Sequence, residues 1–237
     1  MFTAINPNSV KSNMRKAIFF LLAITFTTSA VSSQYVFNKE SNLGLKVGGT
    51  VSMVAFNPSI DLGLNFGFTG GLVFKHIEQK GLGIQLELNF MQAGWKEKLD
   101  TTNRYSRQLN YIQIPFMTHV NLGEGRTRLI LNLGPYGTIL LWEKERISLI
   151  EEQEPSDHYG RDLDNWFEFG LCAGIGLAHY TSIGVFQLEA RYNQSLSNIF
   201  DYSESQFISS KNQVVELSLS YLLDLHARKI GSTRSSE

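Results

Sequence analysis

Residues 81–95 read GLGIQLELNFMQAGW, and this stretch decides the fold. Every second residue from Leu82 to Phe90 is apolar, and the residues between them are glycine or polar. Successive side chains of a β-strand point to opposite faces, so the segment predicts a strand with one apolar face. That face would pack on a second sheet in a soluble sandwich, or face lipid in a membrane barrel. About ten residues are enough for a tilted strand to cross a bilayer.

The same alternation recurs along the chain. It predicts eight strands, at residues 43–55, 64–76, 81–95, 105–121, 126–143, 165–180, 183–195 and 211–225. Long links, starting near residues 56, 96, 144 and 197, alternate with short links near residues 77, 123 and 180. Membrane barrels join their strands by short periplasmic turns and longer extracellular loops, whereas a soluble barrel has no reason to keep this order. We therefore expect an all-β fold, a single antiparallel up-and-down transmembrane β-barrel.

The start of the chain has the pattern of an export signal. Arg15 and Lys16 precede an apolar run at 17–26, and mostly small residues follow up to Ser33. A basic start, a short apolar run and a small-residue cleavage region are typical of a secretory signal peptide. We expect a signal peptide with an upstream extension at 1–33, an outer-membrane β-barrel at 34–225 and a polar C-terminal tail at 226–237. The predicted location is the cell outer membrane.

Composition excludes several classes of function. Of the 237 residues, 43% are hydrophobic and the net charge is −1, which argues against disorder and gives nucleic-acid binding no electrostatic support. Cys172 is the single cysteine, so no intramolecular disulfide can form. The five histidines lack metal-ligand spacing, and no nucleophile-elbow or phosphate-loop motif occurs. We therefore expect no catalytic residues, no cofactor and no metal.

The charged residues of the strands share the face opposite the apolar one. An ionised side chain facing lipid costs up to about 2–4 kcal/mol, so we expect these residues to point into the lumen. Counting back from the hairpin at 196–210 places Arg191 opposite Glu216. A lumen enclosed by about eight strands is filled by side chains, which argues against a pore. The predicted structural lumen network consists of Lys46, Glu87, Gln113, Glu168, Glu189, Arg191 and Glu216.

Aromatic residues gather near the ends of the long links. Outer-membrane barrels carry aromatic girdles at both interfaces, so these positions predict the outer girdle. The predicted girdle consists of Trp95, Tyr105, Trp142 and Trp166. Pro115 and Pro135 fall inside two neighbouring strands, where each is expected to mark a β-bulge because proline cannot donate to the ladder.

Several segments together resemble one protein family. Residues 111–116 read YIQIPF, similar to the Tyr-x-Glu-Ile-Pro-Leu signature of PorT-like outer-membrane β-barrel proteins. NLGPYG at 132–137, the glycine-rich strand at 169–176 and EARY at 189–192 resemble later parts of that family in the same order. The resemblance implies an outer-membrane barrel of this size, and the best-known member is an accessory of the type IX secretion system. Gln113 stands where the family usually has an acidic residue. The chain also continues past the last strand in a polar tail, whereas outer-membrane barrels often end on a terminal aromatic residue.

Two main classes of function follow from this interpretation. The first is a non-enzymatic scaffold, secretion accessory or surface-binding barrel, with outer-membrane lipid and envelope proteins as partners. The second is an outer-membrane enzyme that acts on lipid, which would need a Ser/His or paired-carboxylate site at an interface. The acidic loop at 151–164 is also a candidate calcium site, although a solvated loop is favoured.

Overall fold

The structure is a computed structural model of the whole chain. It describes residues 39–59, 61–79, 81–98, 104–148, 159–160, 163–200 and 208–225. The expected signal peptide and the expected C-terminal tail lie outside the described residues, as does most of the acidic loop. Within the described part of the chain, no helix is long and apolar enough to cross a membrane.

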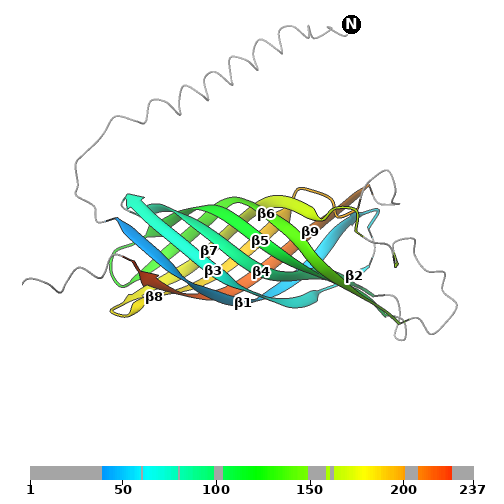
Figure 1. Cartoon of the computed structure of the whole chain (residues 1–237), viewed down its shortest axis with the longest axis horizontal. Coiled ribbons are helices and arrows are strands. Elements are labelled where there is room, and N and C mark those ends of the chain that lie inside the picture. Colours follow the sequence, from blue (N-terminus) through cyan, green and yellow to red (C-terminus); the bar gives the residue numbers. More distant parts are fainter. Residues whose placement is uncertain are drawn as a thin grey trace, which may run out of the picture. The chain divides into compact units, whose positions relative to one another are not determined.

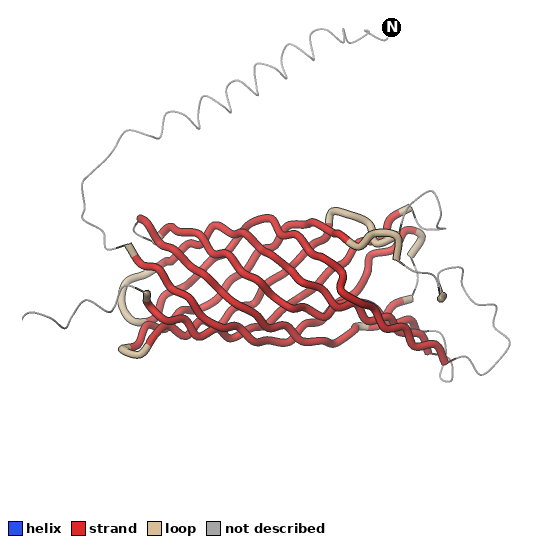
Figure 2. The backbone as a smooth tube through the Cα atoms, in the orientation of Figure 1, coloured by secondary structure: helices blue, strands red, loops and turns tan. Residues whose placement is uncertain are grey.

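Eight long strands close into one barrel (Figures 1 and 2). Each strand pairs antiparallel with its neighbours, and the ring closes because β1 pairs with both β3 and β9. A short element, β2 (Leu62–Gly63), pairs with the end of β4. The strands are β1 (Glu40–Asn57), β3 (Asn65–Gln79), β4 (Leu82–Lys98), β5 (Arg104–Leu122), β6 (Thr127–Ser148), β7 (Phe167–Thr181), β8 (Gly184–Ser195) and β9 (Ser209–Asp224). The predicted all-β, up-and-down barrel of eight strands is confirmed.

Inside and outside alternate residue by residue along every strand. On β4, Leu82, Leu86 and Leu88 are exposed on the outer wall, whereas Gln85 and Glu87 are buried inside. The outer wall is therefore apolar and the interior is polar, the reverse of a soluble barrel and the pattern that lipid requires. The charged and amide side chains of the strands can be buried only because the ring brings them together in the lumen.

The two ends of the barrel differ. The short link between β3 and β4 and the turns at 123–126 and 182–183 share one end with the start of β1 and the end of β9. The long links lie at the other end. Bacterial barrels place short turns in the periplasm, so we assign the short-turn end to that side and the long-loop end to the cell exterior. The strands are longer than the roughly ten residues needed to span, and β5 and β6 extend farthest, with 19 and 22 residues.

The aromatic girdle differs from the prediction. Trp142 and Trp166 are exposed on the outer wall, at 55% and 65%, but Trp95 and Tyr105 are buried inside the barrel. The placement of Trp95 and Tyr105 in the girdle is therefore wrong. Their strands carry them on the same face as Glu87 and Gln113, which point inward. The outer wall has a different aromatic ladder, Phe68–Phe90–Trp142, with ring centroids 5.4 and 5.8 Å apart.

The bulges also lie elsewhere than predicted. Between β5 and β6 the ladder skips the pairs next to Pro115 and Pro135, but the register is the same on both sides of the gap. The register shifts instead between Asn110 and Tyr111, where β6 holds Leu141 as an extra, unpaired residue. Each proline interrupts hydrogen bonding without inserting a residue. Leu141 turns Trp142 outward, although the alternation of the preceding residues would point it into the lumen.

The assignment of the two ends can be tested with one engineered thiol. Glu124 lies in the short turn between β5 and β6. In a Cys172→Ser background, Glu124→Cys should resist a membrane-impermeant maleimide in intact cells and react after the outer membrane is permeabilised. A matched control, Ile208→Cys at the long-loop end, should react in intact cells. Labelling of the Glu124 position alone in intact cells would invert the orientation.

Candidate functional site

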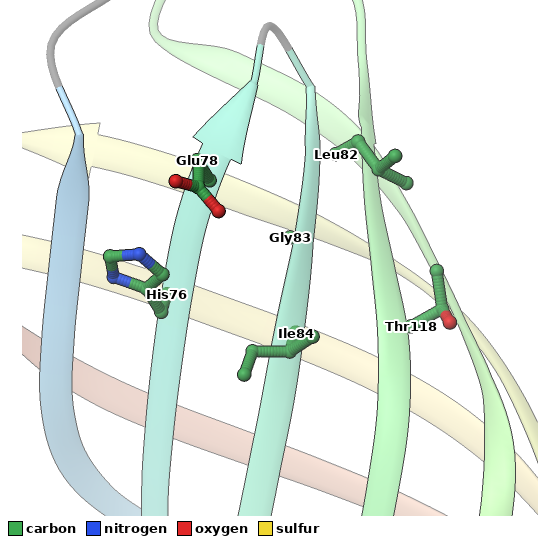
Figure 3. Close-up of a pocket in the computed structure, with 6 residues that line it drawn as sticks. All are labelled: His76, Glu78, Leu82, Gly83, Ile84 and Thr118. Carbon is green, nitrogen blue, oxygen red and sulfur yellow. The ribbon is translucent and has the colours of Figure 1, made fainter. Parts of the chain in front are cut away.

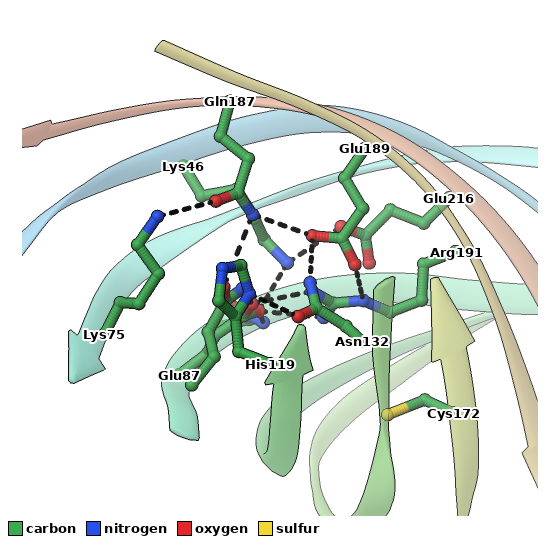
Figure 4. Close-up of polar contacts among 12 residues, drawn as sticks. Lys46, Lys75, Glu87, His119, Asn132, Cys172, Gln187, Glu189, Arg191 and Glu216 are labelled. Carbon is green, nitrogen blue, oxygen red and sulfur yellow. Dashed lines mark hydrogen bonds and ion pairs between the residues drawn. The ribbon is translucent and has the colours of Figure 1, made fainter. Parts of the chain in front are cut away.

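A compact ionic cluster fills the middle of the lumen (Figure 4). Its residues come from β1, β4, β8 and β9, so they surround the bore instead of lying along one wall. All of them are almost completely buried. The cluster consists of Lys46, Glu87, Glu189, Arg191 and Glu216, five of the seven predicted network residues.

Glu87 is the hub of this ionic cluster. Arg191 donates from Nη1 and Nη2 to the two Glu87 carboxylate oxygens at 2.8 and 2.6 Å. Lys46 Nζ donates to Glu87 Oε2 at 2.7 Å. Gln85 and Asn89, the inward neighbours on the same strand, donate at 2.6 and 2.7 Å. One carboxylate thus accepts five hydrogen bonds, including a bidentate guanidinium pair, which is the geometry that makes a buried ion pair favourable.

The other two carboxylates complete the cluster, which holds three carboxylates against two cations. Arg191 Nε donates to Glu189 Oε1 at 2.9 Å, and Lys46 Nζ lies 2.8 Å from Glu216 Oε1. Glu189 also accepts hydrogen bonds from the side-chain amides of Asn132 and Gln187. Gly174 lies directly across from Arg191, where a Cβ would collide with the Glu189 carboxylate. The glycine leaves the space that this cluster occupies.

The predicted register is confirmed, but the ion pair expected from it is not. Arg191 and Glu216 are direct cross-strand partners on β8 and β9. Arg191 nevertheless turns across the bore to Glu87 on β4, and Glu216 pairs with Lys46 on the other neighbouring strand, β1. Across the bore, the two terminal nitrogens of Arg191 reach both carboxylate oxygens of Glu87.

Glu168 and Gln113 lie inside the lumen but outside this ionic cluster. Glu168 accepts hydrogen bonds from the Tyr111 hydroxyl, from Asn212 Nδ2 at 3.0 Å and from Ser195 Oγ at 3.2 Å. Gln113 Nε2 donates to Asn193 at 3.5 Å. The single network expected from the sequence is therefore divided into the ionic cluster, a Glu168 cluster with neutral donors, and a separate Gln113–Asn193 contact.

Sequence reasoning missed two inward-facing groups below the ionic cluster. Lys75 lies 3.4 Å from Gln187 Oε1 and 5.9 Å from the centre of the Tyr180 ring. The Nδ1 atom of His119 lies 2.7 Å from Asn132 Oδ1. Alternation would have placed Lys75 inside, because it shares a face with Val73 and Ile77, whereas the outer residues of β3 are Leu72 and Phe74.

Above the polar clusters, the lumen is closed by an apolar plug. The plug is defined by the buried residues Val54, Phe56, Met91, Ala93, Trp95, Tyr105, Leu109, Tyr111, Ile199, Phe200 and Val214. Arg107 caps it, with its guanidinium 5.8 Å from the Trp95 ring and 5.7 Å from the Phe200 ring, and donates to Glu143 at 2.6 Å. Packed side chains therefore block the bore at a second level.

The described part of the acidic loop packs over this plug. The Tyr159 ring stacks on Tyr105 at 4.2 Å, and its hydroxyl donates to Glu97 at 2.7 Å. Burial, together with the hydrogen bond that Tyr105 donates to Glu145, raises the pKa of the Tyr105 hydroxyl above its usual value. Tyr105 therefore stays neutral and acts as a donor at the long-loop end.

A hollow on the outer wall at the short-turn end is the nearest approach to an interfacial catalytic site (Figure 3). His76 lines it from β3, and Ser41 Oγ lies 2.8 Å from His76 Nδ1. Glu78 is the nearby carboxylate, but it pairs with Lys39 at 2.9 Å. Thr127 and His179 form a similar cross-strand pair elsewhere at this end, also at 2.8 Å. The repetition favours a structural role for both hydroxyl–histidine pairs, in which each pair links two neighbouring strands.

Among the residues that the structure describes, no group of three or more His, Cys, Asp or Glu side chains could hold a metal ion. The calcium site proposed for the acidic loop falls mainly on residues outside the described ranges. The site geometry therefore consists of a blocked lumen, an interfacial hydroxyl–histidine pair and a folded long-loop end.

Comparison with known families decides the identity of the barrel. The family described as outer membrane protein beta-barrel domain matches residues 28–201. The chain belongs to this family. It is an outer-membrane β-barrel protein, as the sequence predicted, and the apolar outer wall faces the lipid of that membrane.

Solved structures of other small barrels are similar to this chain at low identity. Ail, the attachment invasion locus protein of Yersinia pestis, has 14% identity and a TM-score of 0.39, covering 78% of this chain and 99% of Ail. OprG from Pseudomonas aeruginosa has 11% identity and a TM-score of 0.45, covering 78% and 95%. Neisserial surface protein A has 11% identity and a TM-score of 0.41, covering 76% and 96%. No curated protein sequence matches the chain.

A double-mutant cycle tests the ionic cluster. Arg191→Met alone leaves Glu87 with one cation fewer, and Glu87→Gln alone leaves Arg191 with Glu189 only. Each should cost about 3–5 kcal/mol of unfolding free energy, because a buried charge loses its partner. The double variant should cost clearly less than the sum. Urea unfolding in detergent micelles, followed by tryptophan fluorescence, measures all four proteins.

The matched control for this cycle replaces Glu87→Gln by Glu216→Gln. Glu216 is the cross-strand partner of Arg191 but pairs with Lys46, so its coupling to Arg191 should be the smaller of the two. Equal coupling energies in the two cycles, or additive effects in the first, would contradict the geometry of the cluster.

Proposed function

We propose that this protein is a non-conducting, non-enzymatic barrel that acts as a membrane-embedded scaffold or accessory for another envelope protein. The blocked lumen is the observation that carries the proposal. The ionic cluster occupies the middle of the bore, and the apolar plug with Arg107 occupies the long-loop end. We do not expect solutes to pass through the interior of a barrel that is filled in this way. Its remaining functional surfaces are the outer wall and the two ends.

The ion pairs also favour rigidity over transport. Lys46 and Arg191 join β1, β4, β8 and β9 through short contacts, so opening the bore would leave buried charges without partners. Such a core holds the strand ends in fixed positions. A rigid frame with an extended long-loop end suits a protein that positions a partner at the membrane.

The PorT-like resemblance makes the proposal more specific. It supports an accessory role in protein secretion across the outer membrane, with the partner drawn from the secretion machinery. Surface adhesion is the alternative within the same class, and the extension of β5 and β6 beyond the length needed to span favours it. Deletion of the gene separates the two: loss of secreted proteins from the cell surface supports the accessory role, and loss of host or surface attachment alone supports adhesion.

A lipid-acting enzyme is the candidate from a different class. The Ser41–His76 contact beside the outer-wall hollow is the observation in its favour. A hydrolase of this type needs a third group to orient the histidine, and the neighbouring Glu78 is bound to Lys39. We therefore expect the purified barrel to release no fatty acid from phospholipid vesicles, and Ser41→Ala to change nothing.

Conductance measurement tests the proposal directly. Purified full-length protein inserted into planar lipid bilayers should give no steady conductance steps in concentrated potassium chloride, because two layers of packed side chains fill the bore. A general porin, inserted under the same conditions, gives the positive control. Stable steps of uniform size would refute the non-conducting scaffold and favour transport.

A further inference from the structure

The outer wall above the membrane carries an unusual separation of charge. On β4, β5 and β6, beyond the Phe68–Phe90–Trp142 ladder, the side chains alternate between the outer wall and the interior. The charged residues exposed on the outside are Lys96, Lys144 and Arg146, whereas the acidic residues of the same segments are turned inward. Those inward acids are Glu97, Glu143 and Glu145. The outer face of this extension therefore carries one sign of charge.

The three cations lie side by side across neighbouring strands. Lys96 pairs in register with Ser106 on β5, and Ser106 pairs with Arg146 on β6. Lys144 lies one step lower, opposite Gln108. We call these five residues the basic patch. Within the part of the chain that the structure describes, none of its three cations forms an ion pair. Within the described ranges, their charge is therefore not compensated by an ion pair.

The height of the patch above the lipid can be worked out along β6. Below the bulge, the exposed apolar positions of this strand run from Leu129 to Ile139. Ten residues at about 3.3 Å each, tilted by about 40°, rise about 25 Å, which is the height of the apolar band of an outer-membrane barrel. Trp142 then lies at the interface. Each further pair of residues adds about 5 Å, so Lys144 and Arg146 stand about 5 and 10 Å above Trp142.

This height is that of lipid headgroups. In register with Trp142, the neighbouring strands carry Gln92 and Asn110, whose amides are joined by a hydrogen bond of 2.9 Å, and the basic patch begins two residues farther along. The order from below is apolar, then aromatic, then cationic. A glycolipid whose phosphate groups lie beyond its acyl chains presents the complementary order.

We propose that the basic patch is a binding surface for the phosphate groups of an outer-leaflet glycolipid, with its acyl chains against the aromatic ladder. Lys144 is placed for a phosphate nearest the acyl chains. Lys96 and Arg146 form the upper pair, with the Ser106 hydroxyl between them as a further donor. Arginine and lysine are the side chains that bind phosphate by charge-assisted hydrogen bonds. This surface lies on the outer wall and is independent of the blocked lumen and of the proposed scaffold role.

The test uses the full-length protein in detergent and native mass spectrometry. The probes are bisphosphorylated lipid A and the same lipid after enzymatic removal of its phosphates. Wild-type protein should bind the phosphorylated lipid at least tenfold more tightly than the dephosphorylated one. The double variant Lys96→Gln/Arg146→Gln should weaken binding of the phosphorylated lipid about 30-fold, from about 1 kcal/mol for each cation near a charged lipid surface. Binding of the dephosphorylated lipid should not change.

The control variant, Lys39→Gln/Arg126→Gln, removes two charges at the short-turn end and should bind phosphorylated lipid within about twofold of wild type. Heat-modifiable gel mobility confirms that each variant is folded. Inorganic phosphate at millimolar concentration should not displace the lipid, since a lipid held by its chains as well binds more tightly than a free ion. Equal wild-type affinity for the two lipids would overturn the proposal without any variant. Equal weakening by the two double variants would also overturn the proposal, because general charge attraction would then explain the binding.

Discussion

The structure depends on the ion pair between Arg191 and Glu87. In the ring of strands, β8 and β4 are opposite each other, so this bidentate contact crosses the full width of the barrel. Strand ladders hold each strand to its two neighbours only. A contact across the diameter adds a constraint that the ladders cannot supply, and Lys46 extends it by joining Glu87 to Glu216. The lumen thereby takes the role that an apolar core has in a soluble protein.

This arrangement divides the barrel into layers with different physical characters. Charges meet in the middle, where mutual pairing offsets the cost of confinement. Apolar and aromatic side chains close the long-loop end, where the strands leave the membrane and the wall needs internal support. The outer wall follows the opposite order, because lipid replaces water as its neighbour along the apolar band. The polarity of the inner face and of the outer face of each strand therefore changes with depth in the membrane.

Much of this could be predicted from alternation alone. The eight strands, the apolar wall, the inward charges and the Arg191–Glu216 register follow from a period of two and from the lengths of the links. Alternation within the predicted strand 81–95 also places Trp95 on the same face as Glu87, so its burial could have been predicted from the sequence. The choice of Glu87 as the partner of Arg191 could not, because it depends on distance across the bore. The position of Trp142 could not either, because Leu141 carries no mark of a bulge.

The extra residue Leu141 has a consequence for how this gene can change. This one insertion sets whether each later side chain of β6 points outward or inward. Deleting a single codon there would exchange the two faces at once. Lys144 and Arg146 would turn toward the plug, and Glu143 and Glu145 would turn toward the lipid surface. Point substitutions in this segment change one contact each, whereas a one-codon deletion reverses a whole charge pattern. The number of residues in this segment therefore constrains the two faces more strongly than the identity of any one residue.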